Sequence, residues 1–206
     1  MPREGFAHLH VHSEFSRLDG AARVQDMVKA AVADGQPAIA ITDHGVLYGV
    51  VDFTKAAIAA GVKPILGIEA YVTAGSRFDR LPRREEKRYH LTLLAENEAG
   101  YRNLMKLASR AYLEGFYYKP RMDRELLAEH SEGIIAASGC LGGHVAQLLG
   151  PDEASEEGNI GQVRDYDAAL EVAAMYQDIF GKGNWYIEVQ DHGIEGQQRI
   201  MDDLIR

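Results

Sequence analysis

The sequence predicts an α/β fold, and three observations support this prediction. Short β-rich runs alternate with longer amphipathic runs, and each pair takes roughly 25 to 40 residues, as in repeated β-α units around a parallel sheet. The 206 residues, of which 46% are hydrophobic, suffice for one domain that spans 1–206 and has an ordinary core. Polar residues gather where the strands are expected to end, and parallel sheets and barrels carry their sites at those ends.

The N-terminal third contains three expected strands and two expected helices. Apolar residues recur at helical spacing in both helices, and Gly35 and Gly61 follow them as common helix-terminating residues. In chain order, we expect a strand at 6–12, a helix at 23–34, a strand at 38–42, a helix at 48–60 and a strand at 64–72.

The rest of the chain continues this alternation and ends on a helical pattern. The expected elements are a strand at 89–95, helices at 98–113 and 123–129, a strand at 133–138, helices at 142–149 and 162–180, a strand at 185–189 and a helix at 196–206. A crossover helix normally leads to a further parallel strand. We therefore expect the fold to be truncated before its last strand.

Two segments are expected to form surface loops. Residues 73–88 have no useful periodicity, and residues 150–161 are acidic and contain glycine. The first loop carries more basic than acidic side chains: Arg77, Arg80, Arg83, Arg84, Lys87 and Arg88 against Asp79, Glu85 and Glu86. It is therefore locally basic within an acidic chain.

The composition excludes several classes of protein. The 22 basic and 31 acidic side chains give a formal charge of −9, which disfavours non-specific binding of nucleic acid because phosphate binding depends on Lys and Arg. No apolar run approaches the ~20 residues of a membrane span, and the N-terminus does not resemble a secretory signal. A single cysteine, Cys140, excludes an internal disulfide framework. We expect a cytoplasmic protein with no membrane partner.

Histidines and a carboxylate stand at the ends of the first two strands. His8, His10 and His12 alternate along the first strand, so they project from one face at intervals of ~6.6 Å. Asp19 lies in the loop that follows, and His44 directly follows the second strand. Two neighbouring imidazoles on one face suit a shared metal ion.

The later strands add three more groups able to bind metal. Glu69 lies inside an otherwise apolar strand, where a lone carboxylate is costly to bury unless it is paired or bound to a metal. His90 opens the fourth strand, and Cys140 follows the fifth. Taken singly, each has an ordinary explanation, such as a hydrogen-bonded histidine or a small buried thiol. Their joint occurrence at successive strand ends favours a metal site.

Five motifs together resemble a known family. They are HLHVHSEFSRLDG at 8–20, TDHG at 42–45, GIEAY at 67–71, YHLTL at 89–93 and GFYYKPR at 115–121. These motifs closely resemble the PHP (polymerase and histidinol phosphatase) domain and, more narrowly, the N-terminal PHP domains of bacterial replicative DNA polymerase alpha subunits. The resemblance runs over essentially the whole chain. It implies a distorted TIM-like β/α barrel with up to three metal ions at the C-terminal ends of its strands.

The resemblance also implies a ligand set. By motif, the metal ligands fall on His10, His12, Asp19, His44, Glu69, His90 and Cys140. Each position keeps a residue able to bind metal, which indicates an active domain rather than a catalytically silent one. The family's final Asp-x-His motif has no match, because Asp191 and His192 have the wrong spacing and are interpreted as a solvated turn. We expect a packed or supporting role for His8 and leave His130 and His144 unassigned.

The ligand types and the resemblance indicate a reaction. Imidazole, carboxylate and thiolate groups suit Zn²⁺, Mn²⁺ or Fe²⁺ better than Mg²⁺ or Ca²⁺. Such ions activate water for attack on a phosphate ester, so the reaction needs no side-chain nucleophile. The resemblance implies 3′→5′ exonuclease proofreading at a DNA 3′ end. The partners would be the remaining polymerase domains and the replisome, and we expect this chain alone to be weakly active or inactive.

The basic loop and the motif at 115–121 supply candidate DNA contacts. These candidates are Arg83, Arg84, Tyr117, Lys119 and Arg121, with Tyr117 or Tyr118 as a stacking surface. An equally weighted alternative is that the loop is only solvated or contacts the rest of a polymerase.

Two other functions stay open at this point. The first is a stand-alone PHP phosphatase for a small ester such as histidinol phosphate, which the polymerase-like motif at 115–121 disfavours. The second is a non-catalytic module of the polymerase in which bound metal stabilises the barrel, because structural metals use the same ligand residues.

Overall fold

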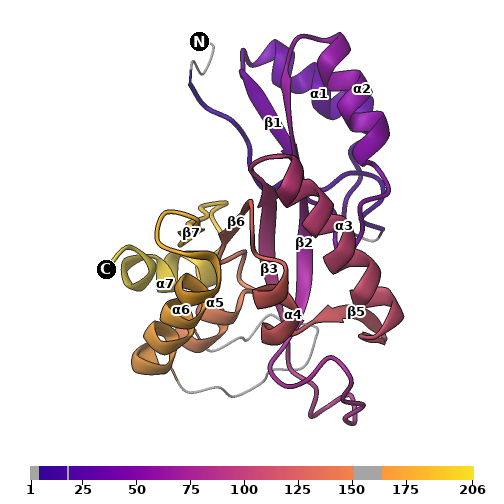
Figure 1. Ribbon diagram of the computed structural model, residues 1–206. Helices are drawn as coiled ribbons and strands as arrows, with labels where there is room; N and C mark the ends of the chain where they lie inside the picture. Colours follow the sequence, from indigo (N-terminus) through magenta and orange to yellow (C-terminus); the bar gives the residue numbers. More distant parts are fainter. Residues whose placement is uncertain (1–4, 18, 151–163) are drawn as a thin grey trace.

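Seven strands form one mixed sheet in the computed structural model, which describes residues 5–17, 19–150 and 164–206 (Figure 1). The order is β4-β5-β2-β3-β6-β7, and β1 pairs with β2 outside this path. The strands are β1 (Ala38–Ile41), β2 (Lys63–Thr73), β3 (Arg88–Ala95), β4 (Phe116–Tyr117), β5 (Lys119–Met122), β6 (Ile134–Ala137) and β7 (Trp185–Tyr186). The long strand β2 pairs with β1, β3 and β5, so it is the centre of the sheet.

The helices lie around this sheet. Among the described residues they are α1 (Val24–Ala33), α2 (Val50–Ala59), α3 (Glu98–Leu113), α4 (Arg124–Glu129), α5 (His144–Leu149), α6 (Tyr166–Phe180) and α7 (Glu195–Ile205). In Figure 1, α1 and α2 lie together beside β1, and α5, α6 and α7 group near β6 and β7. Asn97, Asp123 and Asp165 cap α3, α4 and α6 by accepting hydrogen bonds from backbone N–H groups of the first turn.

The largest core cluster lies between the sheet and α3, α4 and α6. Successive side chains of a strand point to opposite faces, so alternate residues of β2 and β3 enter this core. They include Ile68, Ala70, Val72, Leu91 and Leu93. The intervening residues of the same strands, which include Glu69 and His90, lie on the other face. The cross-strand register pairs Glu69 with Thr92 and Tyr71 with His90, so polar groups face each other there.

The prediction of a strand at 6–12 is wrong. Only one isolated parallel bridge, between His8 and Ile39, joins this segment to β1. The backbone N–H groups of Ala40 and Thr42 donate to His8 and Val11, at distances of 2.8 Å each. A step of two residues from Ala40 to Thr42 therefore corresponds to a step of three residues from His8 to Val11. The extra residue in the N-terminal segment interrupts the ladder, as in a β-bulge.

The α/β class is confirmed, but the expected parallel sheet is wrong. β1–β2, β2–β5 and β6–β7 are parallel, whereas β3 runs antiparallel to both β2 and β6. β2 and β3 are joined by a loop at 74–87 that contains no helix, and without a crossover helix neighbouring strands normally run antiparallel.

Most of the other expected elements are confirmed with shifts of a few residues. The strand expected at 185–189 shortens to β7, and the helix expected at 162–180 is α6, with residues 162 and 163 outside the described part. Most of the expected acidic loop, residues 151–161, also lies outside the described residues. No helix in the described ranges is long and apolar enough to cross a membrane.

Candidate metal centre

The fold brings all seven proposed metal ligands to one edge of the sheet. His44 directly follows β1 and forms a parallel bridge with Glu69 in β2. Cys140 follows β6, whose direction matches that of β2 because β3 lies antiparallel between them. His90 lies near the start of β3, and the start of an antiparallel strand falls at the same edge as the ends of its neighbours. The reversed strand therefore leaves its histidine in the site.

Glu69 is the centre of this group, and its carboxylate contacts four imidazoles. Its Oε1 lies 3.2 Å from Nε2 of His10 and 3.1 Å from Nδ1 of His90. Its Oε2 lies 3.3 Å from Nε2 of His12 and 2.5 Å from Nδ1 of His44. Glu69 is only 1% exposed, so this carboxylate has lost its hydration and depends on these neighbours.

The two remaining ligands lie at opposite sides of Glu69. Asp19 Oδ2 contacts Nε2 of His44, and the Asp19 side chain is exposed. Cys140 Sγ lies 3.5 Å from both Glu69 Oε1 and His90 Nδ1. We call His10, His12, Asp19, His44, Glu69, His90 and Cys140 the histidine cluster. The sequence-predicted ligand set thus lies together in space.

The pKa values reflect a competition between burial and charge. Burial lowers the pKa of His10, but Glu188 and Glu69 outweigh it and raise that pKa to about 10. Burial also lowers the pKa of His44, and Glu69 and Asp19 raise it above its usual value. Burial opposes ionisation of Glu69, yet the surrounding imidazoles hold its pKa well below the usual range. These directions mean that His10 and His44 favour the protonated form beside the carboxylate, and a divalent cation can take over that balancing role.

The donor atoms fit divalent metal ions. Three groups, each with donor atoms within 4.8 Å of one another, share members: His10, His12 and Glu69; His12, Asp19 and His44; His44, Glu69 and His90. Nδ1 of His44 and Oε2 of Glu69 are buried and lie 2.5 Å apart, and among the described residues neither has a partner with hydrogen-bond geometry. Imidazole nitrogens and carboxylate oxygens that converge in this way are the donor set of Zn²⁺, Mn²⁺ or Fe²⁺ sites.

Asp43 supports the cluster but does not belong to it. Its buried carboxylate accepts hydrogen bonds from the backbone N–H and the hydroxyl of Ser13, at 2.7 Å each, and from the hydroxyl of Ser16 at 2.7 Å. The Ser16 hydroxyl also lies 3.3 Å from Nδ1 of His12. Asp43 therefore fixes the segment that carries His12.

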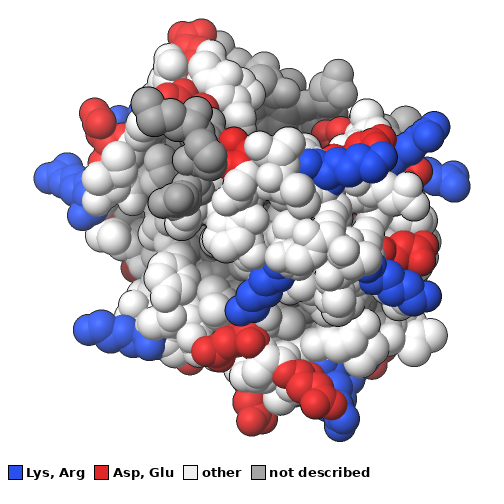
Figure 2. All heavy atoms as spheres, turned by 90° about the horizontal axis from the view of Figure 1, so that it is seen from above, with Lys and Arg blue, Asp and Glu red and all other residues white. Residues whose placement is uncertain are grey.

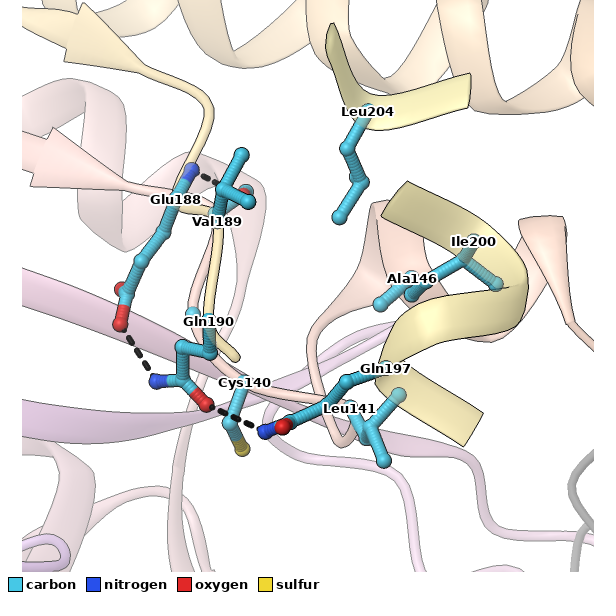
Figure 3. A pocket seen from close by; sticks show the side chains of 11 residues that line it. Cys140, Leu141, Ala146, Glu188, Val189, Gln190, Gln197, Ile200 and Leu204 are labelled. Carbon is cyan, nitrogen blue, oxygen red and sulfur yellow. Dashed lines mark hydrogen bonds between the residues drawn. The ribbon is translucent and has the colours of Figure 1, made fainter. Parts of the chain in front are cut away.

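Sequence reasoning missed Glu188. Its Oε1 lies 2.7 Å from Nδ1 of His10, on the opposite side of the ring from Glu69. Thr92 donates a hydrogen bond to its carboxylate. Gln190 donates to the same carboxylate, and Gln197 of α7 donates to Gln190 (Figure 3). A carboxylate behind a ligating histidine fixes the orientation of the ring. The signal was present, because Glu188 interrupts the apolar run Trp185 to Val189 as Glu69 interrupts its own strand.

The remaining histidines lie outside the cluster. His8 is exposed and makes only an edge contact with the Phe6 ring among the contacts described for its side chain, so its expected packed role is wrong. His144 stacks on Tyr89 with ring centroids 3.8 Å apart. Asp191 and His192 are exposed, and Gly193 N–H donates to the Asp191 carboxylate, which confirms the interpretation of a solvated turn.

The candidate DNA contacts divide into two groups. Arg83 and Arg84 are exposed, whereas Tyr117 and Lys119 are half-buried, and Lys119 lines a groove next to the cluster. The prediction that Arg121 contacts DNA is wrong, because its side chain is fully buried. It donates to Glu86 and to the backbone carbonyls of Gly115, Arg77 and Asp79. These hydrogen bonds satisfy the N–H donors of the planar guanidinium group, and they anchor the basic loop at 73–88 to the interior of the molecule.

The basic loop is only partly solvated. The Arg77 side chain is 4% exposed and forms ion pairs with Asp123 and Glu114, at 2.8 and 2.6 Å. Seen from above, the described basic side chains are spread among acidic ones around the outline of the molecule and form no large basic patch on that face (Figure 2). Any basic contact with DNA on that face would therefore depend on a few individual side chains.

Comparisons with known proteins agree with this geometry. The sequence profile of the PHP domain matches residues 8–192. The chain is 48% identical over 206 residues to DNA polymerase III subunit alpha of Treponema pallidum and 49% identical over 201 residues to that of Thermus aquaticus. These alignments cover 100% and 95% of this chain but only 17% and 15% of the relatives, so the chain spans a small part of their length.

A solved structure shares the fold. It is a protein from Bifidobacterium adolescentis that is named as a metal-dependent phosphoesterase, and it aligns with a TM-score of 0.56. The alignment covers 100% of this chain and 85% of that protein at 16% sequence identity. At this identity the likeness supports the fold, and the chemistry must be argued from the residues of the cluster.

Proposed function

The chain belongs to the PHP domain family, and on this premise we propose that it hydrolyses phosphate esters with divalent metal ions held by the histidine cluster. One observation carries the proposal: four imidazoles surround the single buried carboxylate of Glu69 without any Lys or Arg beside it among the ion pairs of the described residues. The imidazoles around this buried carboxylate can lose their protons. A divalent cation bound by the imidazole nitrogens would then balance the charge of the carboxylate.

Different residues of the chain would bind the metal ions and position the ligands. His10, His12 and Glu69 would hold one ion, His12, Asp19 and His44 a second, and His44, Glu69 and His90, with Cys140 beside them, a third. When bound, such ions lower the pKa of a coordinated water and neutralise charge on a phosphate group. Asp43 holds the segment of His12, and Glu188 holds the ring of His10.

Cys140 does not suit the role of nucleophile. Burial, and then the nearby charge of Glu69, raise the pKa of its thiol above the usual value. A protonated thiol is a weak nucleophile, whereas a metal-activated water needs no side chain to attack phosphorus. The proposed attacking group is therefore water, and Cys140 is a proposed ligand whose thiol would lose its proton on binding a metal ion.

We infer that the substrate is the 3′ end of a DNA strand. The inference rests on the similarity to DNA polymerase III alpha subunits over the whole chain. In the reaction, the water oxygen forms a bond to phosphorus and the bond between phosphorus and the 3′ oxygen of the preceding nucleotide breaks. The released 3′ oxygen takes a proton, and a nucleoside 5′-monophosphate leaves. Within a cytoplasmic replisome, and joined to the remaining polymerase domains, this 3′→5′ exonuclease would proofread newly made DNA.

The full-length polymerase that contains this chain provides the test. With Mn²⁺ or Zn²⁺ present, we expect it to shorten a primer with a mismatched 3′ end, and we expect His12→Ala to lose this activity. His8→Ala is the matched control, since His8 lies in the same segment but outside the cluster. Equal shortening by wild type and His12→Ala, or none by either, would contradict the proposal.

A purely structural role for the metal is a second candidate. The cluster joins the segment of His10 and His12 to β2, β3 and the residues after β6, so a bound ion would tie these parts together. Chelation would then lower the melting temperature strongly, and nuclease activity would be missing from the metal-loaded full-length enzyme. A stand-alone phosphatase has no observation in its favour among these contacts.

A further inference from the structure

A groove beside the histidine cluster is lined by aromatic side chains that the proposed chemistry does not use. Its volume is about 640 Å³, and three of its lining residues, Asp19, His44 and His90, belong to the cluster. Its other lining residues include aromatic rings and one lysine: Tyr48, Tyr71, Tyr112, Phe116, Tyr118 and Lys119. We call these six residues the aromatic groove.

Four rings of the aromatic groove, those of Tyr48, Tyr112, Phe116 and Tyr118, are exposed, whereas Tyr71 is buried. Tyr48 is 66% exposed, Phe116 is 51% exposed and Tyr118 is 57% exposed. The rings of Tyr112 and Phe116 stack with centroids 5.9 Å apart, and the hydroxyl groups of Tyr48 and Tyr112 interact. Several large apolar surfaces exposed side by side mark a binding site rather than a solvated face.

The backbone holds Tyr118 outward at a conformational cost. Tyr118 stands between β4 and β5 and has a φ of 59°, the only positive φ at a non-glycine position among the described residues. This left-handed conformation is unfavourable for a bulky side chain. The buried Arg121 fixes the hairpin from the other side by bonding to the Gly115 carbonyl. The fold therefore stabilises an exposed tyrosine in a strained conformation.

Lys119 brings a positive charge close to the cluster. Its Nζ lies 4.9 Å from the centre of the Tyr71 ring and 3.2 Å from the Tyr71 hydroxyl. The Tyr71 ring in turn stacks on His44, with centroids 5.8 Å apart and planes 17° apart. Within the described residues, Lys119 forms no ion pair with a carboxylate, so its charge is available to an anion such as a phosphodiester.

We propose that the aromatic groove binds the unpaired nucleotides at a single-stranded DNA 3′ end, with bases stacked on Tyr118 and Phe116 and backbone phosphate at Lys119. This inference rests on the proposed function, because the cluster at the floor of the groove would then receive the scissile phosphate. Aromatic side chains stack on any base, but only an unpaired base exposes its faces. A mispaired end separates from its template at lower cost than a paired one. The groove would thereby favour mismatched ends.

A small phosphate ester fits the groove less well. A compact ester would contact the cluster and Lys119 but would leave Tyr48, Phe116 and Tyr118 uncovered, although these are the most exposed rings of the groove. Stacked bases cover such rings and add binding energy at each one. The pattern of exposure therefore favours an oligonucleotide.

Binding of a fluorescent oligonucleotide tests the groove separately from catalysis. The probe is an oligo-deoxythymidine with 2-aminopurine at its 3′ end, mixed with the chain in EDTA so that no hydrolysis occurs. We expect binding to quench the 2-aminopurine fluorescence and Tyr118→Ala to weaken the affinity by roughly 5- to 150-fold, the range for loss of one stacked base. Tyr118→Phe keeps the ring and should bind like wild type.

Tyr186→Ala is the matched control. Tyr186 is 54% exposed, close to the exposure of Tyr118, but it lies in β7 outside the aromatic groove. Equal losses in Tyr118→Ala and Tyr186→Ala, or no quenching by wild type, would overturn the proposal. Lys119→Gln should lower the slope of log affinity against log salt concentration by about 0.7, the value for one phosphate contact on a single strand. An unchanged slope would remove Lys119 from the phosphate site.

The two proposals fail in different ways. If the full-length enzyme shortens a mismatched primer but Tyr118→Ala and wild type have the same KM, the groove is wrong and the proposed function stands. If Tyr118→Ala loses oligonucleotide binding but no metal supports hydrolysis, the groove stands and the exonuclease is wrong.

Discussion

Two buried groups of charged side chains in this molecule differ in how their charge is balanced. The first is the histidine cluster around Glu69, and the second, which we call the arginine network, lies under the basic loop. The network consists of Arg77, Arg88, Arg121, Glu86, Glu114 and Asp123. In it, Arg121 lies 2.9 Å from Glu86, and both side chains are no more than 2% exposed.

The charges of the arginine network are balanced within the described residues, although Nη1 of Arg88 and Oε2 of Glu86 have no hydrogen-bond partner there. Three guanidinium groups face three carboxylates, so the network carries its own counter-charges. Glu69 instead meets only imidazoles, whose charge depends on proton uptake. In the arginine network, guanidinium groups that stay charged stabilise the fold by pairing with carboxylates. Around Glu69, the imidazoles can lose their protons, so a cation from solution can replace the positive charge that those protons supply.

Breaking the arginine network should have the largest effect on stability. Arg121→Met leaves the Glu86 carboxylate buried without its closest cation and removes donors from three backbone carbonyls. We expect a loss of about 3 to 5 kcal/mol in the free energy of unfolding, measured by urea denaturation. Arg84→Met is the control, because the Arg84 side chain is 86% exposed, and it should cost less than about 0.5 kcal/mol. Similar losses in both variants would show that burial does not set the cost.

His144 shows what burial does to a histidine that lacks a carboxylate beside it. Burial, aided by the charge of Lys87, lowers its pKa to about 4, the opposite direction from His10. Because the folded pKa lies below the unfolded value of 6.5, the stability is fully present above pH 6.5 and is lost as the pH falls toward 4. The loss should be about 3 kcal/mol.

Denaturation of His144→Phe across this pH range checks the prediction. Phenylalanine keeps a ring to stack on Tyr89 but cannot take up a proton. The difference in stability between wild type and variant should shrink or reverse as the pH falls from 6.5 to 4. A difference that stays constant with pH would assign the acid sensitivity to other groups.

Most of the stabilisation by bound metal should depend on Glu69. At a metal concentration of about 100 times Kd, we expect the free energy of unfolding to rise by about 2.7 kcal/mol. Glu69→Gln removes the carboxylate shared by two of the three ligand groups and leaves only His12, Asp19 and His44 intact, so Mn²⁺ or Zn²⁺ should raise the melting temperature much less than in wild type. His130→Ala, outside the cluster, should keep the full increase. An undiminished increase in Glu69→Gln would place the metal elsewhere.

The smallest expected effect concerns Glu188. Replacing it with Gln removes the charge behind His10 while keeping a side chain able to accept a hydrogen bond. We expect metal affinity, measured by competition with a chelator, to fall by roughly 10- to 100-fold. Glu195→Gln is the control, since this carboxylate pairs with Arg199 at the surface. Unchanged affinity in Glu188→Gln would mean that the His10 ring needs no support from this carboxylate.

The sequence-based predictions of site residues agreed with the structure where a residue type is unusual at its position in the predicted fold. A carboxylate within an apolar strand, as at Glu69, and histidines at strand ends each have an ordinary explanation, but their joint occurrence favours a site, and the structure brings them together. Glu188 produced the same signal in a shorter run and was missed. Arg121 was misassigned because a basic residue next to tyrosines in sequence gives no information about burial, and its side chain points into the molecule.

The sequence by itself determined the α/β class, the order of most helices and strands and the candidate metal-binding groups, because these depend on local periodicity and on the chemistry of the side chains. Only the tertiary structure decided the antiparallel direction of β3, the interrupted pairing of the segment before β1, the burial of Arg121 and the position of Glu188 behind His10. Each of these depends on contacts between residues far apart in the chain. Such contacts leave no periodic pattern in the sequence, since either partner alone is compatible with several environments.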